Sequence, residues 1–326
     1  MFVRSVWLGT HWLCYHEAMI VVTAGKPYID IDAYACCVAY AELLNLSGTP
    51  ATATSTAVWN ESITASLRAL QAPFATNYHS APEDRFVLVD VSYPSQLDTF
   101  VDEQNVIEVF DHHAGYETYW ADRLGDASHI EFIGAAATLI YEAWARAGMI
   151  DKMSNESAQL LAAAILDNTL NFKARVTTLR DHAAYAFLAR YANLDERWAA
   201  RYFTDCQMTI LADVPTALRN DTKFLTFSGL DGELGLGQLV VWDAKDLLAH
   251  QREVIASTLG ALRPLWLANV VSISEGRSYF VSNNKRVQSW AQRLLDVTFT
   301  GDVATADILW LRKEIVKRDK ERMRQA

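Results

Sequence analysis

The sequence contains no apolar run as long as the roughly 18 to 20 residues that a membrane-crossing helix needs, so we expect no membrane contact. Basic charge is also scarce, because the formal net charge is −10, and this argues against a groove for extended nucleic acid. The cysteines show neither a paired spacing nor a zinc pattern, and they number four: Cys14, Cys36, Cys37 and Cys206. A reducing, cytoplasmic setting therefore fits best.

The length of 326 residues predicts two domains. No glycine- or proline-rich linker separates them, and we place the boundary near residue 195. The expected division is a first domain at 19–195 and a second at 196–326. Residues 1–18 are interpreted as an N-terminal extension outside the structural core, because a buried strand begins directly after Met19.

The first domain alternates short apolar runs with helical patterns, which predicts an α/β fold with a parallel sheet and flanking helices. Strands are expected at 20–23, 86–89 and 106–110. A helix is expected at 32–46, with Asp32 as its N-cap. Further helices are expected at 135–147, 154–167, 178–190 and 194–208, and one should begin at Pro94.

The second domain has a different pattern, in which strands are separated by turn residues. The expected strands cover 224–227, 236–242, 266–273 and 278–281, and the expected helices cover 244–262 and 285–295. This pattern predicts a smaller α+β domain.

Acidic and histidine residues follow three of the predicted strands. Asp30 and Asp32 follow the first strand, Asp90 ends the second, and Asp111-His112-His113 ends the third. Because the carboxyl ends of parallel strands open into one crevice, these side chains should converge. Asp167, late in a helix, is placed to reach the same crevice.

Taken alone, each aspartate is more typical of a helix cap or a turn, and adjacent histidines are often surface residues, so only the combination indicates a site. Two carboxylates about 4 Å apart repel by roughly 4 kcal/mol at an effective dielectric constant of about 20. Two divalent cations would balance the combined charge of Asp30, Asp32, Asp90 and Asp167. Oxygen ligands with one imidazole suit Mn²⁺ or Mg²⁺. Such a pair of metals can activate water for attack on phosphorus.

Four short motifs occur in the order and approximate spacing of the motifs of the DHH phosphoesterase superfamily: Asp30-Ile31-Asp32-Ala33, Val89-Asp90, Asp111-His112-His113 and Ile165-Leu166-Asp167-Asn168-Thr169. The chain resembles this superfamily over nearly the whole first domain. Residues 163–178 look most like the manganese-dependent (family II) pyrophosphatases and their exopolyphosphatase relatives. In the second half, Asn220-Asp221-Thr222-Lys223 is similar to the lysine segment of their DHHA2-type domain.

The resemblance implies a role for each matching residue. One metal would be held by Asp30 and Asp90, with Asp90 bridging to a second metal. The ligands of the second metal would be Asp32, Asp90, His112 and Asp167. His113 would face the substrate and protonate the leaving group or bind a phosphoryl oxygen, while Asp111 would orient a histidine. The substrate phosphates would be bound in the second domain by Lys223, Lys285 and Arg286.

One position departs from the family pattern. Family II pyrophosphatases have a histidine metal ligand four residues before the first aspartate, where this chain has Lys26. A protonated lysine cannot bind a metal. Either the first metal site is weaker and tolerates Mg²⁺ better, or Lys26 supplies positive charge to the substrate.

These observations predict a metal-dependent hydrolase of phosphoanhydride bonds in pyrophosphate or short polyphosphate, with its active site between the domains. One alternative is a DHH phosphodiesterase or phosphatase that acts on oligonucleotides, cyclic dinucleotides or nucleotide bisphosphates. A further alternative is a DHH scaffold that binds a ligand or partner without catalysis. The expected partner is a small phosphorylated substrate, and a homodimer is left open.

Overall fold

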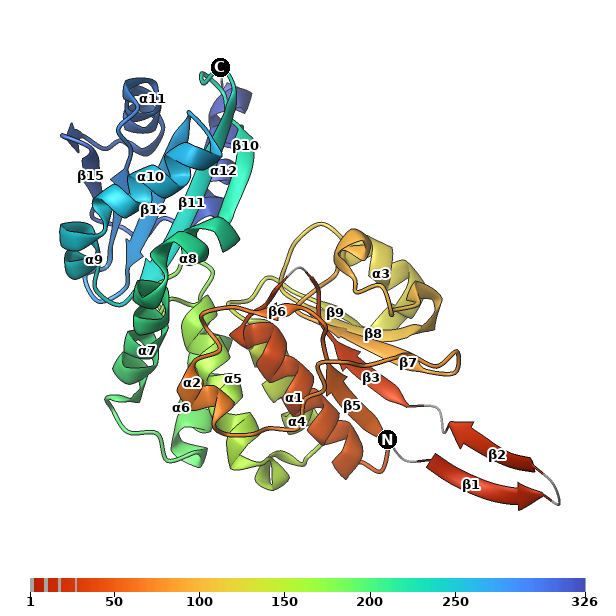
Figure 1. Cartoon of the computed structure of the whole chain (residues 1–326). Helices are drawn as coiled ribbons and strands as arrows, with labels where there is room; N and C mark the ends of the chain where they lie inside the picture. The colour runs from red at the N-terminus through yellow and green to blue at the C-terminus, as the bar shows by residue number, and fades with distance from the viewer. Residues whose placement is uncertain (1–2, 9–10, 17–18, 27, 326) are drawn as a thin grey trace. The chain divides into compact units, whose positions relative to one another are not determined.

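The computed structural model describes residues 3–8, 11–16, 19–26 and 28–325, with only the backbone before residue 19 (Figure 1). The chain divides into two compact units, Met1–Trp198 (unit 1) and Ala199–Ala326 (unit 2). Each unit has a main sheet of its own. None of the described helices combines the length and the apolar character that crossing a membrane requires.

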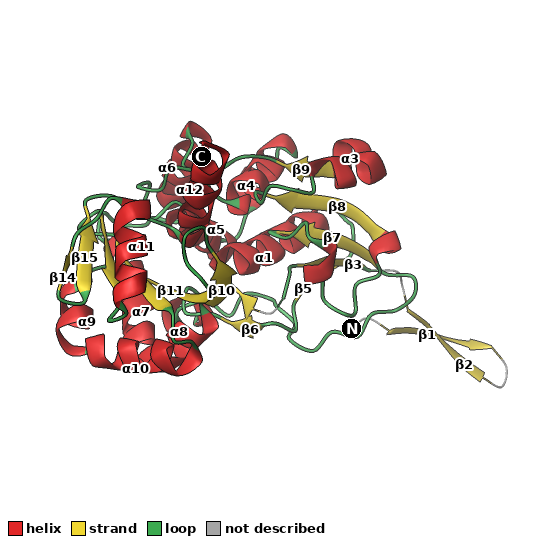
Figure 2. Ribbon diagram, turned by 90° about the horizontal axis from the view of Figure 1, so that it is seen from above, coloured by secondary structure: helices red, strands yellow, loops and turns green. Residues whose placement is uncertain are grey.

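The main sheet of unit 1 has five parallel strands in the order β5-β3-β7-β8-β9 (Figure 2). The strands are β3 (Ile20–Thr23), β5 (Ala51–Thr54), β7 (Arg85–Val89), β8 (Val106–Asp111) and β9 (Ser128–Ile130). The apolar runs of β3 and β7 are buried on both faces, as is typical of a covered parallel sheet. The expected α/β fold is confirmed.

Two small sheets accompany the main sheet of unit 1. The first pairs β1 (Val3–Leu8) with β2 (His11–His16) in antiparallel fashion, within the segment interpreted above as an extension. The second pairs β4 (Tyr28–Ile29) with β6 (Val58–Trp59) in parallel. The β4 strand lies in the loop that connects β3 to the first helix, so it helps to place Asp30 and Asp32.

Helices cover both faces of the main sheet of unit 1. On one face, Trp120 of α3 packs in a hydrophobic cluster with Val21, Phe86 and Leu88 from the strands. The helices α1, α4, α5 and α6 pack against one another, and α1 also contacts β3 and β5. The helix bounds are α1 (Ile31–Leu46), α2 (Ala65–Arg68), α3 (Glu117–Leu124), α4 (Ala136–Arg146), α5 (Asn155–Asn168) and α6 (Leu179–Tyr191).

The start of α1 differs from the expectation. The N-cap is Asp30, whose Oδ1 atom accepts a hydrogen bond from the Ala33 N–H at 3.1 Å, and the helix begins at Ile31. Asp32 lies in the first turn and is fully buried. The helix expected at Pro94 is only a 3₁₀ turn, Pro94–Gln96.

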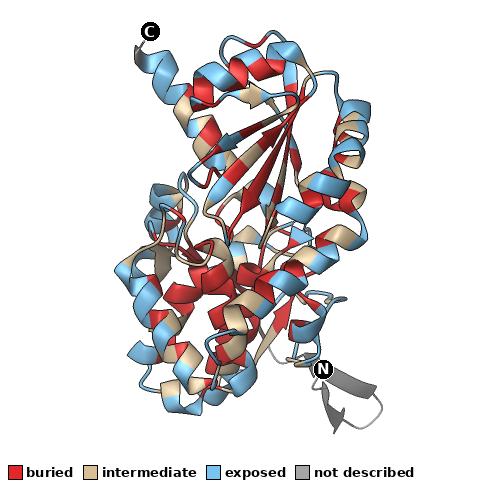
Figure 3. Ribbon diagram, turned by 90° about the vertical axis from the view of Figure 1, so that its left-hand side faces the viewer, coloured by how far each residue is buried: buried red, intermediate tan, exposed pale blue. Residues whose placement is uncertain are grey.

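Unit 2 contains a mixed six-stranded sheet in the order β10-β11-β12-β13-β15-β14, in which only β11 and β12 are parallel neighbours. Buried residues line its strands, as Figure 3 shows. The strand bounds are β10 (Thr222–Thr226), β11 (Glu233–Val241), β12 (Trp266–Ser272), β13 (Arg277–Val281), β14 (Phe299–Thr300) and β15 (Val303–Ala306). This arrangement confirms the smaller α+β domain.

Two hydrophobic clusters lie in unit 2. One contains Leu239 of the sheet with Leu218 and Leu259 of the helices, and the other contains Phe280 with Trp290 and Ile315. The helices are α7 (Trp198–Ala212), α8 (Val214–Asn220), α9 (Lys245–His250), α10 (Arg252–Leu262), α11 (Lys285–Leu295) and α12 (Arg312–Gln325). The helix expected at 244–262 is therefore wrong, because the chain breaks it into α9 and α10 at Gln251.

Candidate metal centre

The candidate site is built from the ends of neighbouring strands of unit 1 and from the start of α1. Asp90 directly follows β7, Asp111 is the last residue of β8, and His112 and His113 come next. Strands β7 and β8 are adjacent and parallel. Their carboxyl ends therefore present these side chains at one edge of the sheet.

Asp90 lies close to both histidines. Its Oδ1 atom lies 3.4 Å from His112 Nε2 and 3.8 Å from His113 Nδ1. The ligand atoms of these three residues all lie within 4.8 Å of one another, which is close enough to surround a single metal ion. The His112 Nε2 atom is also 3.9 Å from Asp32 Oδ2, so Asp32 borders the same group.

The backbone at Asp90 has an unusual conformation that directs it to the site. Its φ angle is +56°, in the left-handed region that few residues other than glycine adopt. The Asp90 N–H donates to the carbonyl oxygen of Phe110 at 2.8 Å, which fixes this turn to β8. Strained positions of this kind cluster at functional sites.

Asp32 is held by the first turn of α4. Its Oδ2 atom accepts from the Ala136 N–H at 2.9 Å, and its Oδ1 atom accepts from the Ala137 N–H at 2.8 Å. Burial raises the pKa of Asp32 well above its usual value, and the charges of Asp90 and Asp30 raise it further. Hence the carboxylate charges of the site destabilise one another when no cation is present.

His112 is oriented by a backbone group. Its Nδ1 atom lies 3.2 Å from the carbonyl oxygen of Ile133, and a carbonyl can only accept a hydrogen bond. The neutral ring therefore carries its proton on Nδ1, and Nε2, which faces Asp90, carries the lone pair that a metal requires.

Asp111 organises the turn that carries both histidines. Its Oδ1 atom accepts from the backbone N–H groups of His112 at 2.7 Å and His113 at 3.2 Å, and it lies 2.8 Å from His113 Nδ1. Burial acts to raise the pKa of Asp111, but the hydrogen bond and charge of His113, together with a hydrogen bond from Ser92 and the charge of His112, lower it overall. Asp111 is thus a carboxylate partner of the half-exposed His113 ring.

Among the described residues, the compact group of possible ligands consists of Asp90, His112 and His113, and neither Asp167 nor Lys26 is one of its members. Asp167 is partly buried in the last turn of α5, a helix that packs on α1 and α4. Lys26 is exposed, and its N–H donates to the carbonyl oxygen of Gln96 at 2.9 Å. The metal-ligand role of Asp167 and the two alternatives for Lys26 stay predictions.

The three cationic residues assigned to the second domain are exposed and belong to two elements of unit 2. Lys223 lies within β10, paired in register with Leu236, and does not precede the strand as expected. Lys285 and Arg286 form the first turn of α11, where Lys285 Nζ donates to Gln288 Oε1 at 3.0 Å. Their role in substrate binding also stays a prediction.

The residues of the site fit a divalent cation. Three carboxylates, those of Asp30, Asp32 and Asp90, influence one another electrostatically, and an imidazole nitrogen faces two of them. Carboxylate oxygens with imidazole are ligands that suit Mn²⁺. Positive charge at this position would remove the mutual repulsion that raises the pKa of Asp32.

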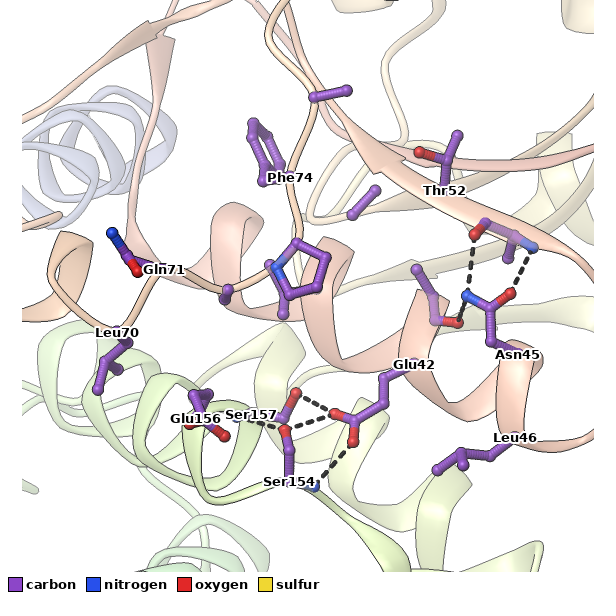
Figure 4. Close-up of a pocket in the computed structure, with 17 residues that line it drawn as sticks. Glu42, Asn45, Leu46, Thr52, Leu70, Gln71, Phe74, Ser154, Glu156 and Ser157 are labelled. Carbon is purple, nitrogen blue, oxygen red and sulfur yellow. Dashed lines mark hydrogen bonds between the residues drawn. The ribbon is translucent and has the colours of Figure 1, made fainter. Parts of the chain in front are cut away.

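A cavity of about 610 Å³ lies elsewhere in unit 1 (Figure 4). It is lined by the second half of α1, by β5, by residues 70–75 and by the start of α5. The Glu42 carboxylate in its wall already accepts hydrogen bonds from Ser154 and Ser157, and Asn45 bonds to the backbone of Ala41 and Ala51. These polar groups therefore hold the wall together.

The chain is similar to several proteins described as manganese-dependent inorganic pyrophosphatases, although no family model matches it. The chain is 27% identical over 314 residues to a probable manganese-dependent inorganic pyrophosphatase of Bacillus licheniformis, covering 92% of this chain and 96% of that protein. It is 28% identical over 242 residues to a protein of the same description from Deinococcus radiodurans, covering 70% and 73%.

Two further proteins support this similarity. A manganese-dependent inorganic pyrophosphatase of Methanothrix thermoacetophila is 27% identical over 192 residues, a match that spans 56% of this chain and only 58% of that protein. A solved structure from Methanococcus jannaschii, provisionally named as a family II inorganic pyrophosphatase, has the same fold, with a TM-score of 0.68. It is 21% identical, and the match covers 94% of this chain and all of that one. The expected resemblance to the manganese-dependent (family II) inorganic pyrophosphatases is confirmed.

Proposed function

We propose that this protein is a divalent-metal-dependent phosphohydrolase that cleaves the phosphoanhydride bond of pyrophosphate or short polyphosphate. The observation that carries the proposal is the group formed by Asp90, His112 and His113, with Asp32 beside it. The relatives described above, named as manganese-dependent inorganic pyrophosphatases, support both the reaction and the metal.

Two Mn²⁺ or Mg²⁺ ions per site are part of the proposal. The ligands would be Asp30, Asp32, Asp90, His112 and Asp167. Four of these are carboxylates, so two divalent cations would balance their charge. The chemistry that such cations supply is activation of a water nucleophile and neutralisation of phosphate charge.

His113, supported by Asp111, is proposed to supply a proton to the leaving group. The hydrogen bond from Nδ1 to Asp111 stabilises the protonated imidazole of His113 and fixes the direction of the ring. A second proton on Nε2 can then be delivered to the departing phosphate oxygen. Because half of the His113 side chain is exposed, a substrate can reach it.

Cationic side chains would bind the negative charge of the substrate. Lys223, Lys285 and Arg286 are assigned to this role by the family resemblance, and Lys26 is the candidate within unit 1. Charge-assisted hydrogen bonds to phosphoryl oxygens are stronger than neutral ones. We also propose a cytoplasmic location, since Cys36 and Cys37 are thiols within the core.

A substrate panel tests the proposal. Purified full-length protein is assayed with Mn²⁺ and with Mg²⁺ on pyrophosphate, tripolyphosphate, long-chain polyphosphate, pApA and bis-nitrophenyl phosphate. We expect the highest kcat/KM on pyrophosphate or tripolyphosphate, and no turnover after chelation. Turnover of pApA or bis-nitrophenyl phosphate alone would favour the phosphodiesterase alternative. Absence of turnover on every compound would favour the non-catalytic scaffold.

A further inference from the structure

The segment that leads into α4 contacts the metal centre through backbone groups. The carbonyl oxygen of Ile133 contacts His112 Nδ1, and the N–H groups of Ala136 and Ala137 bind both carboxylate oxygens of Asp32. Two of the proposed metal ligands, His112 just after β8 and Asp32 in α1, are thus oriented by groups within five consecutive residues. The position of this short segment therefore sets the geometry of the centre.

Asp181 of α6 holds this segment at two points. Its Oδ2 atom accepts from the Gly134 N–H at 3.1 Å, and its Oδ1 atom accepts from the Thr138 hydroxyl at 2.7 Å. These two anchors lie on either side of Ala136 and Ala137. Asp181 is fully buried, so water cannot substitute for either hydrogen bond without rearrangement of the core.

The contact at Gly134 is too close for a side chain. A Cβ atom at this position would lie 2.7 Å from Asp181 Oδ2 and 2.7 Å from Thr169 Cγ2. The segment therefore lies in close contact with both Asp181 and Thr169. Only glycine permits this approach.

Asp181 also has an ordinary role in its own helix. It forms a capping box with Thr178, whose N–H and hydroxyl bind Asp181 Oδ2 at 2.7 and 2.8 Å. The two threonine hydroxyls that bind Asp181 belong to different elements. Thr178 takes part in capping α6, whereas Thr138 belongs to α4 and anchors the segment beside the metal centre. Removal of one partner at a time can tell these functions apart.

We propose that Asp181 is a positioning residue for the metal centre, which acts on Asp32 and His112 through residues 133–138, the segment that enters α4. This inference rests on the proposed metal-binding function. Asp181 is buried and is not itself a proposed ligand, but it would fix the positions of the ligands Asp32 and His112 relative to each other. The expected consequence is a loss of metal affinity that exceeds any effect of weakening α6.

The test measures the Mn²⁺ dissociation constant of metal-free, full-length protein by calorimetry, with the urea unfolding midpoint measured in parallel. Asp181→Ala should raise the dissociation constant about 10- to 100-fold, the range for residues that orient metal ligands. Thr138→Val should raise it about threefold or more while leaving the capping box intact. Thr178→Ala should lower the unfolding midpoint but leave the dissociation constant within about twofold.

Asp181→Asn provides the rescue. Its amide oxygen can accept from Gly134 and Thr178, while its NH₂ group donates to the Thr138 hydroxyl, so the affinity should return close to that of the wild type. Equal dissociation constants for wild type, Thr138→Val and Asp181→Ala would overturn the inference, as would equal losses in Thr138→Val and Thr178→Ala. If Asp181→Ala does not fold, the two threonine variants decide. Failure of the wild type to bind Mn²⁺ would overturn the proposed function as well.

Discussion

The Nε2 atom of His112 lies 3.4 Å from the Oδ1 atom of Asp90, while the Nδ1 atom of the same ring lies 3.2 Å from the carbonyl oxygen of Ile133. The Nδ1 atom therefore contacts the backbone that orients the ring, while the Nε2 atom faces the candidate metal site. An imidazole in this arrangement is prepared to bind a cation without a change of tautomer. The variants discussed below test this arrangement and the residues around it.

His112→Gln removes the imidazole nitrogen that we propose as a metal ligand and keeps a polar side chain of similar length. We expect the Mn²⁺ dissociation constant to rise about tenfold or more, measured by calorimetry on metal-free protein. His129→Gln is the matched control, because His129 lies on the neighbouring strand β9 and pairs with Glu108 at 3.3 Å. If both variants bound Mn²⁺ as tightly as the wild type, His112 would not be a ligand.

Gly134→Ala places a methyl group against two buried side chains, Asp181 and Thr169. We expect a loss of about 1 to 3 kcal/mol in the free energy of unfolding, as for other overpacked positions. The control is Gly260→Ala in α10, where the nearest atom would lie at 3.6 Å. That change should be neutral or slightly stabilising, because alanine favours a helix. Equal urea midpoints for Gly134→Ala and wild type would contradict the close contact.

Lys26→His restores the residue found at this position in family II pyrophosphatases. If Lys26 weakens the first metal site, the variant should bind Mn²⁺ more tightly and should prefer Mn²⁺ over Mg²⁺ more strongly than the wild type. Calorimetry with both metals measures this preference. An unchanged affinity combined with a higher KM would instead identify Lys26 as a substrate-binding residue.

Lys223→Ala removes one cation that we propose to contact the substrate. Such a contact contributes on the order of 1.5 to 3 kcal/mol, so kcat/KM on tripolyphosphate should fall about ten- to a hundredfold. The Mn²⁺ affinity should not change. Lys320→Ala, at an exposed position of α12, is the control for loss of one positive charge from unit 2. A similar effect of both variants would show that only the overall charge matters.

Much of the fold follows from local patterns in the sequence. The strand Ile20–Thr23 and the helix Lys285–Leu295 have the expected bounds, because an uninterrupted apolar run and a clear amphipathic pattern define them. The short strand β9 and helix α3 were not foreseen. The helix α3 has only 8 residues, and apart from the buried Trp120 it exposes most of them.

The sequence could predict that Asp90, His112 and His113 lie together, but it could not predict which groups orient them. Asp30 and Asp32 are both residues that can cap a helix. In the structure, the carboxylate of Asp32 accepts hydrogen bonds from the N–H groups of Ala136 and Ala137 instead. Those bonds join positions more than a hundred residues apart, and backbone donors leave no signature in the sequence. The pattern Thr178-x-x-Asp181 indicates a capping box, but the approach of Gly134 to Asp181 exists only in the folded chain.

The central claim is that the Asp90 group is a metal-dependent catalytic site for phosphoanhydride hydrolysis. The most direct measurement compares phosphate release from pyrophosphate by the wild type and by Asp90→Asn, both saturated with Mn²⁺. The account predicts that the wild type turns over and that the variant loses about a thousandfold or more in rate, with its circular dichroism spectrum unchanged. Near-wild-type release by Asp90→Asn would contradict it.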